Sequence, residues 1–233
     1  MNTFFLALFR PVKAFNEVKL ADKFSAMSLI ILLFLMLSNL ILLIPATVKI
    51  NTITFSSISL PEDQLDTITR VAYKMRYLQA AGTTILYLIM SLFCALLLYV
   101  FVRIAKEMLT YKSALQLFMY SYFIVTIGDL VNTALLYIRG LDAIKSVYDT
   151  SLTGLNLLTS MERVGITEYV FLSYITPFQV WFVVLLCIGL KIFTNMNTVK
   201  SVVISVLFWF ITILIPTLSV CFSELTMEKS GIM

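Results

Sequence analysis

Five long apolar stretches limit what this chain can fold into; they occupy residues 24–47, 82–102, 114–138, 176–194 and 201–222. About 20 helical residues, each rising about 1.5 Å, cross the roughly 30 Å hydrocarbon core of a bilayer. Each stretch is long enough for this and carries almost no charge. With a mean hydropathy of +0.96, the sequence predicts an all-α fold. It is expected to be a polytopic helical membrane protein with five transmembrane helices and short amphipathic outer helices.

The segments between the apolar stretches are too short to form a separate soluble domain. We therefore expect one membrane domain over residues 1–233. It has a cytoplasmic interfacial segment over residues 1–23 and outer segments over residues 48–81 and 139–175.

Composition argues against several classes of function. The chain has no histidine and only 7 glycines, which are scattered. Imidazole metal ligands and histidine-based nucleophile systems are therefore excluded, and no phosphate-binding glycine loop can be drawn. The three cysteines, Cys94, Cys187 and Cys221, lie in apolar stretches, where a thiol packs as a small apolar side chain. We predict no enzyme activity, no catalytic residue, no cofactor and no metal site.

The charged residues predict an orientation. With the N-terminus in the cytoplasm, the inner segments carry nine basic and three acidic residues, and the longer outer segments carry eight basic and nine acidic residues. Basic residues concentrate in cytoplasmic loops of membrane proteins, which favours a cytoplasmic N-terminus and an extracytoplasmic C-terminus over the reverse orientation. The basic residues form no patch interleaved with aromatic side chains, so nucleic-acid binding is not predicted.

The first 23 residues do not read as a secretory signal, because the basic residues follow the short apolar run instead of preceding it. They predict a helix lying on the membrane surface, with its lysines at anionic head groups and Pro11 breaking or bending it. The side chains expected to face lipid are Phe4, Phe5, Leu8, Phe9, Val12 and Phe15.

Local signals fix two further features. Thr176, Pro177 and Gln179 occupy the N-cap, first and capping-box positions of a helix. Either the fourth span begins there and residues 169–175 precede it in the outer interface, or one long helix kinks at Pro177. The connection over residues 195–198 is so short that the last two spans must form an antiparallel hairpin.

The outer segments contain apolar residues spaced three or four apart. Residues 60–80 predict an amphipathic helix leading into the second span, and residues 141–164 predict one or two short helices, with Gly154 a potential break. These helices either cap the bundle or lie in the membrane interface, or they form a docking surface for a partner protein or an amphipathic peptide.

Asp129 is the only acidic residue well inside an apolar stretch, and Asn132 lies on the same helical face. A carboxylate at this depth costs roughly 2–3 kcal/mol or more unless it is paired or neutralised. Three interpretations stay open. Asp129 belongs to a proton or cation pathway, or it is hydrogen-bonded to polar residues such as Asn39, Thr83 or Thr84 and holds helices together, or the span is shorter and Asp129 lies near the outer interface.

Three motifs carry a family resemblance: Arg10-Pro11-Val12-Lys13-Ala14-Phe15 before the first span, Thr110-Tyr111-Lys112-Ser113-Ala114-Leu115 with Tyr120-Ser121-Tyr122 at the third, and Phe178-Gln179-Val180-Trp181 with Gly189-Leu190-Lys191 in the fourth. In this order and spacing the chain resembles the Yip family of membrane proteins, named for interaction with Ypt/Rab GTPases, and specifically its bacterial branch. It departs from the family pattern where Phe123 to Thr126 lack a proline found after the third-span tyrosine. The motifs of the eukaryotic branch are also missing, so binding to a Rab-type GTPase is not carried over.

The resemblance implies a non-enzymatic accessory protein in a bacterial plasma membrane. Its partner would be another membrane complex, such as the ABC transporter subunits of an efflux system that gives antimicrobial peptide resistance. The candidate interaction residues are Arg10, Pro11, Phe15, Tyr111, Lys112 and Trp181. The basic residues around Lys112 also fit simple contact with lipid head groups. The alternative function is a small transporter, channel or permease subunit that uses Asp129. Neither the partner nor the oligomeric state follows from the sequence.

Overall fold

A computed structural model describes residues 2–21, 26–57, 62–144 and 147–229. These residues form α-helices and 3-10 helices, with no strand among them. They divide into two compact units, each built from several parts of the chain. The first unit comprises residues 1–25, 91–125 and 153–233, and the second comprises residues 26–90 and 126–152.

Among the described residues, five helices are long and apolar enough to cross a membrane, which confirms the predicted fold class. They are α3 (Ala26–Ser57), α4 (Glu62–Ile104), α5 (Tyr111–Arg139), α8 (Pro177–Thr194) and α9 (Thr198–Lys229). Three of them extend well beyond the predicted stretches, because polar flanking residues continue the helix. The amphipathic helix predicted over residues 60–80 is one such extension, since it runs without a break into the second span as α4.

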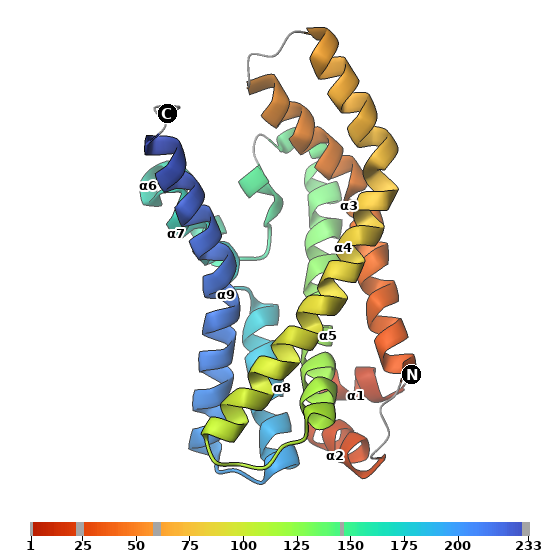
Figure 1. Ribbon diagram of the computed structural model, residues 1–233, viewed down its shortest axis with the longest axis vertical. Coiled ribbons are helices and arrows are strands. Elements are labelled where there is room, and N and C mark those ends of the chain that lie inside the picture. The colour runs from red at the N-terminus through yellow and green to blue at the C-terminus, as the bar shows by residue number, and fades with distance from the viewer. Residues whose placement is uncertain (1, 22–25, 58–61, 145–146, 230–233) are drawn as a thin grey trace. The chain divides into compact units, whose positions relative to one another are not determined.

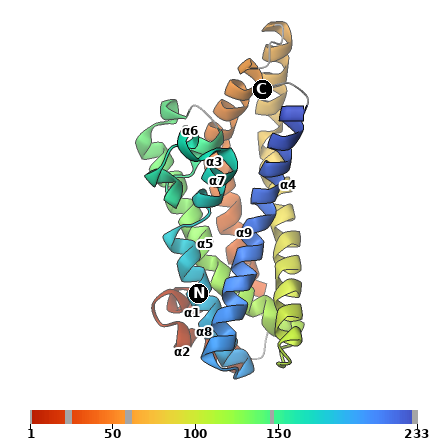
Figure 2. The same cartoon turned by 90° about the vertical axis from the view of Figure 1, so that its left-hand side faces the viewer.

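The last two membrane-length helices form the predicted hairpin in the first unit (Figure 1). The Thr176 hydroxyl caps α8 by accepting a hydrogen bond from the Gln179 backbone N–H at 3.1 Å. Asn195, in the left-handed conformation with φ of 60°, ends the helix. The start of the fourth span at Thr176-Pro177 is thereby confirmed, and the residues before it form a separate short helix, α7 (Ile166–Ser173), which packs against α9 (Figure 2).

The N-terminal segment forms two helices, α1 (Asn2–Phe9) and α2 (Pro11–Ala21). The break falls at Arg10 and Pro11, as the proline predicts. Within the first unit α2 packs against α8 near its C-terminal end. Because α9 runs antiparallel to α8, the N-terminal helices and the end of α9 lie at opposite ends of this unit (Figure 1). Which side of a membrane each end occupies stays a prediction.

The connection between α5 and α8 contains more short helices than the one or two predicted. They are η1 (Leu141–Ala143), η2 (Val147–Thr150), η3 (Leu155–Leu158) and α6 (Met161–Val164), followed by α7. Gly140 and Gly165, with φ of 88° and 87°, interrupt the chain in a conformation that other residues rarely adopt. Gly154 also lies at a break, and a side chain there would overlap the Ser173 carbonyl.

Each unit has its own packed centre. In the first unit, Phe118 stacks on Tyr122 with ring centroids 5.2 Å apart, and Phe182 and Phe208 meet Phe118 edge-on at 6.3 and 6.1 Å. In the second unit the buried side chains Ala46, Leu136 and Ile144 form a small apolar cluster, which Leu43, Ile50, Leu141 and Leu152 extend. The single-domain organisation predicted from the sequence stays a prediction.

Candidate functional site

Phe15 is a candidate interaction residue that the sequence predicts to face lipid. The prediction is wrong, because the structure buries its side chain. Its ring meets Phe193 edge-on at a centroid distance of 6.4 Å and lies over Gly189 of α8. An added methyl group at Gly189 would overlap the Leu117 side chain and press on Phe15. Gly189 therefore permits the close approach of α2 and α5 to α8 within the first unit. The helical period of residues 1–23 indicated an apolar face, but not that a distant helix covers part of it.

Lys19 fixes the other end of α2. Its ammonium group donates a hydrogen bond to the Ile192 carbonyl oxygen in the last turn of α8, where a cation also balances the negative end of the helix dipole. The opposite face of α2 is open. Arg10 and Pro11 line a shallow groove there, with Arg10 exposed and Pro11 partly buried.

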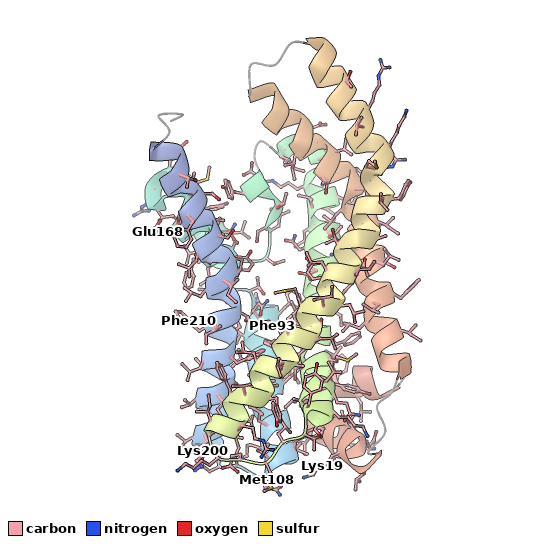
Figure 3. All side chains as sticks on the ribbon, viewed as in Figure 1. Lys19, Phe93, Met108, Glu168, Lys200 and Phe210 are labelled. Carbon is pink, nitrogen blue, oxygen red and sulfur yellow. The ribbon has the colours of Figure 1, made fainter. Side chains whose placement is uncertain are left out.

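The loop between α4 and α5 carries two more candidates. Tyr111 is partly exposed, and its hydroxyl donates a hydrogen bond to the Leu92 carbonyl at 3.2 Å, so it holds the start of α5 against the last turns of α4. Lys112 is exposed beside it. Glu107 of the same loop forms an ion pair of 3.0 Å with Lys200 of α9. Figure 3 shows Met108 and Lys200 at one end of the first unit, far from Glu168.

Trp181 lies on the open side of α8, and the residue is 38% exposed. The next residue, Phe182, belongs to the aromatic centre of the first unit. The tryptophan of the Phe-x-x-Trp motif therefore points outward. Phe182, which follows the motif, makes the ring contacts inside the first unit. The structure does not bring Trp181 together with Tyr111 or Arg10 through any hydrogen bond or ring contact among the described residues.

Asn132 has a structural role in the second unit. Its amide nitrogen donates to the Thr150 carbonyl at 2.8 Å, and its amide oxygen accepts from the Leu152 N–H at 2.7 Å. Both ends of the side chain are therefore used to hold the segment after η2 against α5. Asn39, considered as a partner for Asp129, instead accepts a hydrogen bond of 2.7 Å from the buried Thr133 hydroxyl.

Asp129 is exposed on α5. Within the part of the chain that the structure describes, no side-chain hydrogen bond or ion pair reaches its carboxylate. α5 continues beyond Asp129 to Arg139 without a break, which does not support a span that ends near this residue. A hydrogen bond between α5 and α3, considered above for Asp129, is made instead by Thr133, one turn later in α5, and Asn39 of α3.

An ion pair lies beyond the end of α5. Lys49 near the C-terminal part of α3 binds Asp142 of η1. The hydrogen bond and the charge of Lys49 hold the pKa of Asp142 below its ordinary value. Both groups are accessible to solvent, so the pair positions η1 more than it stabilises the fold.

The structure also reveals an apolar surface that the sequence did not single out. Leu155, Leu157 and Leu158 of η3 are exposed, with 82% of Leu158 accessible. We call these three residues the leucine face. In the sequence, this surface is a leucine-rich run that contains one asparagine. Its apolar spacing of three or four residues is typical of an ordinary amphipathic helix, so the run was not singled out. The tighter 3-10 turn instead buries Asn156 and leaves all three leucines outside.

The described residues contain no group of three His, Cys, Asp or Glu side chains placed to hold a metal ion. A comparison with protein-family models matches residues 5–219 to the Yip1 domain. A comparison with curated proteins found no match, and a comparison with solved structures found none either. The family match extends from α1 to the last membrane-length helix. The chain therefore belongs to the Yip family of membrane proteins.

Proposed function

We propose that this protein is a non-enzymatic, multi-pass membrane protein that binds another membrane complex as an accessory subunit. The observation that carries the proposal is the leucine face, which presents apolar side chains outside the five membrane-length helices. Exposed apolar groups bordered by polar residues are typical of protein-interaction sites. Glu162 and Arg163 of α6 and Glu168 of α7, all exposed, follow the leucine face along the chain.

The leucine face is held in a fixed conformation. The Leu155 N–H donates to the Ile175 carbonyl at 3.1 Å, which ties η3 to the segment before α8. Gly154 lies so close to Ser173 that only a glycine fits. A preformed surface loses less conformational entropy on binding than a flexible one, so this arrangement suits recognition of a partner.

The resemblance to bacterial members of the family supports a more specific partner. We propose the subunits of an ABC-type efflux system that protects the cell against antimicrobial peptides. The protein would then reside in the bacterial plasma membrane with its N-terminus in the cytoplasm, and the leucine face would lie on the outer side.

Affinity purification in mild detergent tests this proposal. The full chain should recover a membrane-protein partner in a fixed ratio. Changing Leu157→Ser and Leu158→Ser together should reduce that recovery at least about tenfold, because interface anchors typically contribute more than 1 kcal/mol each. The matched control carries Ile85→Ser and Leu86→Ser, two exposed neighbours on α4, and should retain the partner. Recovery of the chain alone under several mild conditions would count against the proposal.

A second function has one observation in its favour, the exposed Asp129 carboxylate in α5, for which the described residues offer no side-chain partner. A small transporter or permease subunit could use such a group to bind a proton or a cation. Ion or substrate flux into proteoliposomes should then fall in Asp129→Asn and stay unchanged in Asp142→Asn. Equal flux in all three proteins removes Asp129 from any transport mechanism.

A further inference from the structure

We propose that the groove beside α2 binds the head group of a monoanionic phospholipid, with an acyl chain along its apolar border. The groove has a volume of about 570 Å³. It is formed entirely within the N-terminal segment, by Arg10, Pro11, Val12, Lys13, Asn16, Glu17 and Leu20. This inference is independent of the proposed partner and concerns the opposite end of the first unit.

The charges of the groove define the head group. Arg10 and Lys13 supply two positive charges, and Glu17 supplies one negative charge on the same side of α2. The lining therefore carries a net charge of +1, which complements a single phosphodiester. Arg and Lys both bind phosphate oxygens, Arg through two parallel hydrogen bonds. Lys19 is not part of the groove, because its ammonium group is bound to the Ile192 carbonyl.

The apolar border distinguishes a lipid from a soluble anion. Val12 and Leu20 line the groove, and Leu20 and the neighbouring Phe9 are 84% and 83% exposed. Such side chains are more stable in an apolar environment than in water. A free phosphate would leave them uncovered, whereas the acyl region of a phospholipid would cover them.

The groove lies at the level in the membrane where phospholipid head groups are found. α2 is anchored on the end of α8 through Phe15 and Lys19, as described above. α8 is a membrane-length helix, and its last turn must lie where the hydrocarbon core meets the head groups. An amphipathic helix fixed at this depth has basic residues at the phosphate level and apolar residues just below.

Lipid retention by the full-length protein tests the inference. The protein is reconstituted in nanodiscs with equal amounts of phosphatidylglycerol and phosphatidylcholine, released into detergent and examined by native mass spectrometry. Wild type should retain phosphatidylglycerol selectively. Arg10→Gln with Lys13→Gln should retain about thirtyfold less, since each basic residue near an anionic lipid contributes on the order of 1 kcal/mol. Arg10→Lys with Lys13→Arg should restore binding.

Two further variants make the outcome decisive. Val12→Ser with Leu20→Ser should also lose phosphatidylglycerol, whereas full retention would show that the head group alone is bound and overturn the assignment of an acyl chain to the apolar border. Arg70→Gln with Lys74→Gln removes the same charge from two exposed positions on α4 and should bind as wild type does. Equal loss in this control, or no selectivity in wild type, would refute a defined groove. Unchanged thermal unfolding in each variant shows that the fold is intact.

Discussion

Gly189 and Phe15 show how a single position governs the docking of a helix. The glycine leaves room for Leu117 and for the Phe15 ring at the surface of α8. The sequence contained both residues within recognisable motifs, but it could not show that they meet. Their contact joins residues far apart along the chain, and helical periodicity reports only the faces within one helix.

Changing Gly189→Ala should lower the free energy of unfolding by about 1–3 kcal/mol, because Leu117 is fully buried and has little room to move. The control is Gly82→Ala in α4, where an added Cβ meets no atom within 4 Å. Thermal unfolding in detergent should show a lower Tm for the first variant only. Equal Tm values would contradict the close packing described at α8.

Asp142 gives a prediction about pH. Because Lys49 lowers the pKa of Asp142 in the folded protein, the ionised pair favours the folded position of η1 above the unfolded pKa of about 3.9. This contribution is lost as the pH falls through the lower, folded pKa. A carbon-13 NMR titration should place Asp142 below its ordinary pKa, and Lys49→Gln should return it toward that value. A titration unaffected by Lys49→Gln would show that the ion pair does not form.

At the scale of elements, the sequence predicted the features that depend on local chemistry. The start of α8 followed from Thr176 and Pro177, and the break between α1 and α2 followed from Pro11. The short turns before α7 were not predicted correctly, because 3-10 turns are set by hydrogen bonds to distant residues. Asn132 is the clearest example, since its bonds to Thr150 and Leu152 shape a segment that has little helical pattern of its own.

Replacing Asn132→Ala should release this segment. The Leu152 N–H loses its acceptor and the Thr150 carbonyl loses a donor, and each partly buried group left unpaired costs about 1–3 kcal/mol. Hydrogen exchange measured by mass spectrometry should become faster in peptides covering residues 147–153. Thr133→Ala serves as the control, because it removes the bond to Asn39 and leaves the Asn132 bonds in place. Equal exchange in wild type and Asn132→Ala would show that the Asn132 hydrogen bonds do not hold this segment in place.

For the whole molecule, hydropathy alone predicted five membrane-length helices, since crossing a bilayer requires both length and low charge. It could not predict the interaction surfaces. The leucine face and the groove beside α2 depend on which apolar residues remain uncovered after folding, and that is a property of tertiary packing.

Orientation can be measured directly by cysteine labelling. In a variant with Cys94, Cys187 and Cys221 replaced by Ala, single cysteines are introduced at two exposed positions, Asn197 and Glu168. The charge distribution predicts that a membrane-impermeant maleimide labels Glu168→Cys in intact cells and Asn197→Cys only after permeabilisation. The reverse labelling pattern would show that the N-terminus is outside.

Photo-crosslinking in living cells shows whether the leucine face binds a membrane-protein partner. A photoreactive amino acid is placed at Leu158 and, as a control of equal exposure at the other end of the first unit, at Met108. We predict a discrete crosslinked membrane protein from Leu158, lost when Leu155→Ser and Leu157→Ser are added, and no such product from Met108. Crosslinks from Leu158 to lipid alone, or the same products from both positions, would show that the leucine face is not a binding surface for a protein partner.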